Sequence, residues 1–376
     1  MLALTAPVLF ACTKVADNTT TESKAVTMTV KLSPGVLKGR GEMPAVPAAY
    51  TSQIETAVIF VTDVGGNVIT VYPLIATDID TDGEGAVATF ETTSAAWDVL
   101  VLANYPASFD PDDYTTKTMI EGAAFDMADL QAVPETGHEH GVQHAMMYNF
   151  DFVDGVFDNK DTGVTPEEWD ASLNIAPVVA RFELSEVAGT AAKPADGSAD
   201  DQLLLKSYTL AGVFMNNIYP SLKLAGGVQG TGTLINVDDI ADASLPVWAQ
   251  DVYTDEFEDG LTYAPATADD VWAYHVAPSA GELPWVTLHL KDVVYDDGAA
   301  GIPAAATDLY VPVTAYRLAG GGATVDEFAR GTVYQVASVT FNSWHLSTTP
   351  SPQSILLTAT ITVLPWEYAP IEPDLN

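Results

Sequence analysis

The chain has 376 residues, enough to bury a large core, and it is strongly acidic, with 51 acidic and 14 basic side chains. Five of the basic residues but only two of the acidic ones precede Gly41, so residues 41–376 carry 49 acidic and nine basic side chains, a formal charge of −40. Such a charge repels nucleic acid and anionic lipid, which argues against both as partners.

The first motif in the chain is the run Leu9-Phe10-Ala11-Cys12, which follows a short apolar stretch. This arrangement is typical of a bacterial lipoprotein signal, whose cysteine is acylated and becomes the N-terminus. The stretch before Leu9 has no Lys or Arg, which departs from the usual signal. Cys12 is the only cysteine, and no other stretch approaches the roughly 20 apolar residues that cross a bilayer. We therefore expect residues 1–12 to be a signal and the lipid on Cys12 to be the membrane anchor.

A strictly alternating segment covers residues 25–32, after a polar tether. Its alternation predicts a half-buried edge strand. Ser33-Pro34-Gly35 ends this strand, and Lys38 and Arg40 follow in a glycine-flanked loop that we expect a protease to reach. The next basic residue is Lys117. The apolar face of the strand consists of Val26, Met28, Val30 and Leu32.

The first half of the chain continues as β-structure. Residues 118–133 permit a weak helix, and Thr165 is a candidate cap for a second short helix that begins at Pro166-Glu167-Glu168. The acidic stretch after Tyr72 is predicted to be a hairpin turn. The predicted strands are Val58–Thr62, Val68–Tyr72, Ala86–Phe90 and Trp97–Asn104.

The second half repeats the opening pattern of a strand, a loose loop and a second strand, which predicts two similar β modules that join near residues 160–172. Strand spacing with turn residues between favours β-sandwiches, so the predicted fold class is all-β. The last strand alternates like the first. The predicted strands are Pro177–Leu184, Leu205–Met215, Trp285–Leu290, Leu309–Tyr316, Tyr334–Phe341 and Ser354–Leu364.

Two clusters have the residue types of metal sites. His138, His140 and His144 could converge on zinc, but no fourth ligand is evident. Asp78, Asp80 and Asp82 resemble the start of a calcium loop, but its twelfth position is Thr89 instead of Glu. We favour a polar loop for the first cluster and a hairpin turn for the second, and predict no metal site.

Enzyme signatures are missing: the sequence has no nucleophile elbow, metalloprotease motif, phosphate loop or dinucleotide fingerprint. We therefore predict no catalytic residues and no cofactor. Arg181 interrupts an apolar strand, and we expect it to point outward and pair with an acid. Trp97, Trp285 and Trp366 lie in or beside strands, so we expect them in the core rather than on a sugar-stacking surface.

Several of these features together resemble the fimbrillins, the lipoprotein-derived pilus subunits of Bacteroidales bacteria. The resemblance implies two tandem transthyretin-like β-sandwich domains, assigned here to residues 41–168 and 169–376, with residues 13–40 as a removable propeptide. It also implies lipoprotein export, arginine-specific trimming outside the cell and a place in a fimbrium at the outer membrane of a Gram-negative bacterium. The features are Cys12, the strand before Arg40, Trp97–Asn104, Val179–Leu184 and Val363–Trp366.

Carried onto this sequence, the resemblance places the cut between Arg40 and Gly41, with Lys38 as an alternative, and the strand that is removed is residues 25–32. Its groove would be filled by a C-terminal strand of another copy or of a related fimbrial subunit. The protease would be trypsin-like. The donor residues would be Leu357, Ala359, Ile361, Val363 and Trp366.

Three functions remain open at this stage. The favoured one is a structural stalk subunit that polymerises by strand exchange, because the chain retains a C-terminal strand that a terminal subunit does not need. The second is a tip or accessory subunit, or another surface lipoprotein, that binds a glycan or a host surface protein. The third, a glycoside hydrolase, rests only on the abundance of carboxylates.

Overall fold

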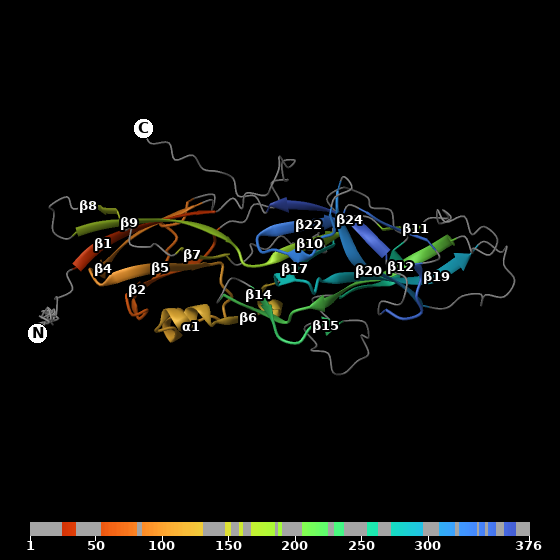
Figure 1. The fold of residues 1–376 in the computed structure, drawn as a ribbon, viewed down its shortest axis with the longest axis horizontal. Coiled ribbons are helices and arrows are strands. Elements are labelled where there is room, and N and C mark those ends of the chain that lie inside the picture. Colours follow the sequence, from red (N-terminus) through yellow and green to blue (C-terminus); the bar gives the residue numbers. More distant parts are fainter. Residues whose placement is uncertain are drawn as a thin grey trace, which may run out of the picture.

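The protein is an elongated molecule in which two β-sandwich domains follow one another along the long axis (Figure 1). No helix in the part of the chain described by the structure is long and apolar enough to cross a membrane. The computed structural model describes residues 25–34, 54–80, 85–130, 147–151, 158–160, 167–184, 187–189, 205–224, 229–236, 254–261, 272–295, 308–319, 323–336, 338–342, 345–350 and 357–365.

The first domain is built from eight strands: β1 (Ala25–Pro34), β2 (Ala57–Asp63), β3 (Val68–Pro73), β4 (Ala86–Thr93), β5 (Ala96–Ala103), β7 (Met147–Asp151), β8 (Asp158–Lys160) and β9 (Glu167–Pro177). Their order is β3-β2-β5-β7-β9-β1-β4, with β8 paired to β9 outside this path. The end of β9 pairs with β7 and the rest of it pairs with β1. The two sheets of the sandwich are therefore joined along one side.

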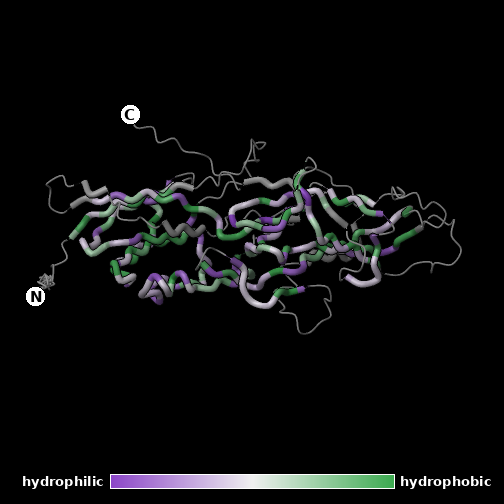
Figure 2. Tube along the Cα trace, in the orientation of Figure 1, coloured by the Kyte–Doolittle hydropathy of each residue, from purple (hydrophilic) through white to green (hydrophobic). Residues whose placement is uncertain are grey.

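Alternation along the strands builds the core of this domain. Because successive side chains in a strand point to opposite faces, one face of β1, β4 and β9 and one face of β2 and β5 meet in a closed apolar layer. Figure 2 shows hydrophobic and hydrophilic residues alternating along the strands of both domains. The layer contains Met28 and Val30 of β1, Phe90 of β4, Trp169 of β9 and Val101 of β5.

The second domain has the sheet order β15-β12-β19-β20-β24-β22-β10-β17, with β16 paired to β12. Two short pairs lie beside it, β11 (Val187–Gly189) with β23 (Val339–Phe341) and β18 (Ser279–Ala280) with β21 (Glu327–Phe328). The bounds of the main strands are β10 (Ala180–Leu184), β12 (Leu205–Ile218), β15 (Ile235–Asn236), β16 (Thr254–Leu261), β17 (Trp272–Val276), β19 (Trp285–Tyr295), β20 (Asp308–Leu318), β22 (Thr332–Val336) and β24 (Leu357–Pro365).

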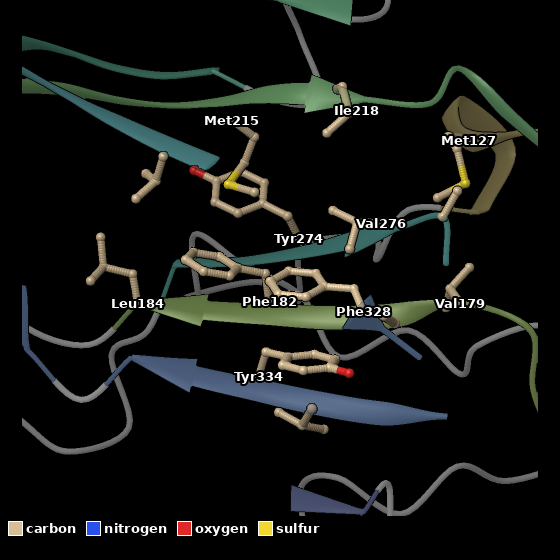
Figure 3. Packing of buried hydrophobic residues seen from close by; sticks show 14 of the residues in the cluster. Met127, Val179, Phe182, Leu184, Met215, Ile218, Tyr274, Val276, Phe328 and Tyr334 are labelled. Carbon is tan, nitrogen blue, oxygen red and sulfur yellow. The ribbon is translucent and has the colours of Figure 1, made fainter. Parts of the chain in front are cut away.

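Aromatic side chains fill the centre of the second domain. Phe328 stacks on Tyr334 with ring centroids 4.1 Å apart, and Phe182 lies beside Phe328 (Figure 3). Stacked and tilted aromatic pairs of this kind contribute about 0.5–1.5 kcal/mol beyond the burial of their area.

A segment of the first domain connects the two sandwiches. It contains η2 (Pro111–Asp113), α1 (Lys117–Glu121), β6 (Ala124–Asp126) and η3 (Met127–Leu130). β6 pairs with β13 (Ser221–Lys223), which also pairs with β14 (Gln229–Thr231). The backbone N–H of Met127 donates to the carbonyl of Pro220 at 2.8 Å, and Figure 3 shows the Met127 side chain among residues of the second domain. The two domains therefore share a small sheet and a continuous apolar cluster.

The all-β fold expected from the sequence is confirmed, but three local expectations are wrong. The helix over residues 118–133 is limited to α1, because β6 and η3 form where the chain turns onto the second domain. Glu167 and Glu168 begin β9 rather than a helix, since β1 offers them a parallel partner. The domain boundary at 168/169 falls inside β9, so by strand pairing the first domain extends to Pro177.

Candidate functional site

The first strand, β1, lies inside its sheet and not at an edge. It pairs antiparallel with β4 along Ala25–Leu32 and parallel with β9 along Val26–Pro34. Figure 1 shows β1 between these two strands. The expected edge position is therefore wrong. The parallel partner β9 lies far from β1 in the sequence, so no pattern in the residues around β1 indicates it.

The apolar face of β1 is buried throughout, and its four side chains are at most 3% exposed. Met28 lies opposite Phe90 of β4 and Trp169 of β9. Burial of such a side chain contributes roughly 1.5–3 kcal/mol. Without β1, the domain would expose this apolar groove and leave the facing backbone groups of β4 and β9 unpaired, which is costly unless another strand replaces it. The four side chains are Val26, Met28, Val30 and Leu32.

The opposite face of β1 is polar and partly open to solvent. The hydroxyl oxygens of Thr29 and Thr89 lie 3.2 Å apart and form a hydrogen bond between β1 and β4. Lys31 is exposed and lies opposite Val87, whose side chain is 47% exposed. The inner face of β1 is therefore fully buried. On its outer face, one threonine pair forms a hydrogen bond and the apolar side chain of Val87 remains exposed to solvent.

Pro34 is the last described residue before Ile54. The expected cut between Arg40 and Gly41, the alternative at Lys38 and the expected lipid site Cys12 lie outside the described residues.

The C-terminal strand, β24, occupies a place in the sheet of its own domain. Its first half, Leu357–Ile361, pairs parallel with β20, and its second half, Thr362–Pro365, pairs antiparallel with β22. Ala359 is buried and Thr360 is exposed, as the alternation predicted. Trp366 lies outside the described residues. β24 thus passes from one sheet of the second sandwich to the other.

The acidic stretch after Tyr72 is described up to Asp80 and again from Gly85, and Ile79 and Ala86 form an isolated antiparallel bridge; the predicted turn itself lies outside the described residues. The carboxylate of Asp78 accepts hydrogen bonds from the Tyr72 hydroxyl and the backbone N–H of Ile75, both at 3.0 Å, and Asp80 donates its N–H to the carbonyl of Gly85 at 2.9 Å. Among the described residues no three His, Cys, Asp or Glu side chains group as metal ligands do. The residues Asp82, His138, His140 and His144 lie outside the described part of the chain.

Arg181 is buried and not outward as expected. Its Nε donates to Glu183 Oε1 at 2.7 Å, and Gln335 donates to the other carboxylate oxygen at 3.3 Å. β10 lies between β17 and β22, so both charged side chains are enclosed by neighbouring strands. The ion pair itself follows the sequence expectation, whereas its burial could only be found from the sheet order.

The tryptophans divide between core and surface. Trp285 is buried, as expected. Trp97 is 42% exposed, because it lies on the opposite face of β5 from its buried neighbours Ala96 and Asp98. The expectation of a core position for Trp97 is therefore wrong.

A buried histidine lies at the junction of the two domains. His275 of β17 donates from Nδ1 to the carbonyl of Leu130 at the end of η3, over 2.6 Å. Burial, and then the positive charge of Arg181, lowers the pKa of His275 to about 3. The imidazole is therefore neutral at physiological pH and acts as a hydrogen-bond donor between the domains. Sequence reasoning missed this residue, because nothing beside it in the chain indicates contact with η3.

A polar hollow of about 380 Å³ lies at the end of the first domain. Asn104 has a left-handed φ of 52°, and its side-chain oxygen accepts the backbone N–H groups of Glu55 and Thr56 at 2.8 and 3.3 Å. Ser108 donates to Asp129 at 3.1 Å. These contacts hold the segment after β5 against the start of β2.

Comparisons with known proteins identify the fold. No family model and no curated protein matches the chain. A putative cell adhesion protein from Parabacteroides distasonis ATCC 8503 matches with a TM-score of 0.58 and 11% identity, over 92% of this chain and 98% of that one. A fimbrilin from Porphyromonas gingivalis W83 matches with a TM-score of 0.55 and 14% identity, over 91% of this chain and 98% of that one. The chain has the fimbrillin fold.

A third structure with this fimbrillin fold is a putative cell adhesion protein from Bacteroides eggerthii DSM 20697, with a TM-score of 0.55 and 15% identity over 91% of this chain and 95% of that one. All three matches extend over both domains. The resemblance inferred from the sequence is therefore confirmed at the level of the fold.

Proposed function

We propose that the protein is a structural subunit of a cell-surface fimbria that joins the next subunit by strand exchange after a cut behind β1. The observation that carries this proposal is the position of β1. It is a fully paired central strand, yet it is tied to the rest of the domain only through a segment that contains Lys38 and Arg40. One cut in that segment turns an internal strand into a separate peptide held by noncovalent contacts alone.

The physical chemistry of the site favours replacement over simple loss. A separated β1 still fills its groove, because leaving would expose its apolar row and two unpaired strand edges. A strand with a similar apolar row can take that place and satisfy the same backbone groups. β24 offers such a row and carries no charged side chain, so its insertion adds nothing to the repulsion between strongly acidic subunits.

The fimbrial role is supported by the fold shared with a fimbrilin and with putative cell adhesion proteins. Export as a lipoprotein through Cys12, trimming by an arginine-specific protease and location at the outer membrane belong to the same proposal. They rest on the motifs of the N-terminal segment and on the sequence resemblance.

Limited digestion of the purified precursor with an arginine-specific protease tests the proposal. We expect a stable product that begins at Gly41, followed by fibres in electron micrographs and oligomers that resist mild detergent. Lys38→Ala is the matched control and should behave as the wild type, whereas Arg40→Ala should remain an uncut monomer. A trimmed product that stays monomeric at high concentration would contradict strand exchange.

A further inference from the structure

The C-terminal strand repeats the centre of the first strand. Residues Thr27-Met28-Thr29-Val30 of β1 correspond to Thr360-Ile361-Thr362-Val363 of β24, with three identical residues and one Met-to-Ile exchange. We propose that β24 of a second copy enters the groove of β1 in the register set by this repeat. Ile361 then takes the place of Met28, and Val363 takes the place of Val30. This inference rests on the proposed function and specifies its interface.

The inner row of the groove fits this register. Val30 lies opposite Ala88 of β4 and Ala171 of β9, and an incoming Val363 is the same residue in the same space. Ile361 matches the volume of Met28, and volume-conserving exchanges are the ones that packed cores tolerate best.

The residues at the two ends of the inner row are also compatible with this register. Ala359 takes the place of Val26 at the start of the groove, so the reduction in volume falls outside its centre. Pro365 takes the place of Leu32, the last residue of β1 that pairs with β4, two residues before β1 itself ends in Pro34. Proline is tolerated better toward the end of a strand than in the middle of its ladders.

The outer row gives an independent argument. In this register Thr362 replaces Thr29, so its hydroxyl can form the same hydrogen bond to Thr89 that spans 3.2 Å in the present structure. Leu364 replaces Lys31 and lies opposite the exposed Val87. An apolar cross-strand pair then covers a side chain that β1 leaves open to water.

Shifted registers lose these matches. A shift by two residues in one direction places Ala359 in the space of Met28, opposite Phe90 and Trp169, and leaves a cavity in the middle of the core. A shift by two residues in the other direction places Pro365 in the space of Val30, where the strand is paired on both sides and a proline removes a ladder hydrogen bond. A shift by one residue turns the threonines into the groove.

The direction of the strands is compatible as well. The groove of β1 has one parallel neighbour, β9, and one antiparallel neighbour, β4. β24 already pairs with one parallel and one antiparallel neighbour, β20 and β22, in its own domain. The same backbone can therefore form both kinds of ladder.

Cysteine pairs test the register in the assembled protein. The only native cysteine, Cys12, precedes the expected cut and does not interfere. The matched variant carries Thr89→Cys with Thr362→Cys, and the two shifted controls, one for each direction, carry Thr89→Cys with Thr360→Cys or Leu364→Cys. A shift of two residues moves the partner by about 6.8 Å along the strand, which is beyond the reach of a disulfide. All variants are trimmed and assembled under reducing conditions and then oxidised.

We expect a ladder of covalent oligomers on a non-reducing gel from the matched pair, which disappears on reduction, and loss of this ladder in both controls. A ladder from a shifted pair would overturn the register while leaving strand exchange intact. If fibres form but none of the cysteine pairs gives covalent oligomers on the gel, the placement of β24 in this groove is overturned. Failure of the trimmed wild type to assemble would overturn the proposed function and the register together.

A locked precursor supplies the geometric control. Thr29→Cys with Thr89→Cys should form a disulfide within one chain, because these residues are directly opposite. β1 then stays in its groove after trimming, and assembly should be lost until a reductant is added. Assembly of the oxidised, trimmed variant would show that the groove of β1 is not the acceptor.

Discussion

Among the strands that the structure describes, the two domains follow the same order, except that the second domain contains one strand with no counterpart in the first. In the first domain the chain order β1, β2, β5, β7, β9 corresponds to β10, β12, β19, β20, β22 in the second, with the same parallel pair and, apart from one inserted strand, the same neighbours. β7 and β9 pair directly through Met147 and Tyr148, whereas β24 lies between their counterparts β20 and β22.

This difference indicates that β1 is required by the sheet of the first domain, whereas β24 is not required by the sheet of the second. β1 belongs to the repeated set and is paired on both sides along nearly its whole length. β24 is additional to that set, and each of its neighbours pairs with only half of it. We infer that the first domain requires an occupant in its groove, whereas the second domain retains a complete set of strands when β24 leaves.

The largest expected effect comes from a charge in the middle of β1. Val30→Asp places a carboxylate in a fully buried position, which costs several kcal/mol unless the group becomes protonated. The first domain of the precursor should then fail to fold, as judged by loss of its unfolding transition in calorimetry.

The neighbouring residue provides the control. Lys31→Asp puts the same side chain on the exposed face of the same strand and should leave the transition nearly unchanged. Equal damage from both substitutions would mean that the strand, and not its buried face, is sensitive to charge.

A smaller effect on the monomer, but a loss of assembly, is expected from a charge in β24. Ile361→Asp would bring a carboxylate into the acceptor groove, so fibres should be absent from electron micrographs of the trimmed protein while its first domain still unfolds as in the wild type. Thr360→Asp, at an exposed position of the same strand, should still assemble. Normal fibres from Ile361→Asp would remove β24 from the donor role.

The smallest effect concerns the junction between the domains and appears only in acid. The pKa of His275 is about 3 in the folded protein, against 6.5 for an ordinary exposed imidazole, so its contribution to stability is complete above pH 6.5 and is lost as the pH falls toward 3. The loss can reach about 1.4 kcal/mol for each pH unit in that window.

His275→Asn keeps an N–H donor for the carbonyl of Leu130 but does not titrate. Urea unfolding at pH 7.5 and 4.5 should therefore show a smaller acid loss for the variant than for the wild type. The many carboxylates titrate in both proteins and cancel in this difference. Identical losses would show that His275 is already protonated or exposed in the folded state.

The alternation of residues 25–32 was enough to predict a strand with one buried face, because period-two alternation depends only on neighbouring residues. The alternation of residues 357–363 likewise predicted β24, in which Ala359 is buried and Thr360 is exposed. The central position of β1 could not be predicted, since it depends on Glu167–Ile175 arriving as a parallel partner. The same limit explains Arg181, whose burial depends on β17 and β22, and His275, which contacts η3. Short-range patterns identified these strands, whereas the neighbours of each strand could be found only from the structure.

The pairing of β6 with β13 bears on how a fibre would respond to force. A pulling force would pass from the first sandwich to the second through the β6–β13 ladder, the Met127–Pro220 hydrogen bond and a shared apolar cluster. It would not be carried by a flexible linker alone. We expect each subunit to behave as a stiff rod about two domains long. The fibre should then bend chiefly at the joints between subunits, so its persistence length would report on the exchanged strands.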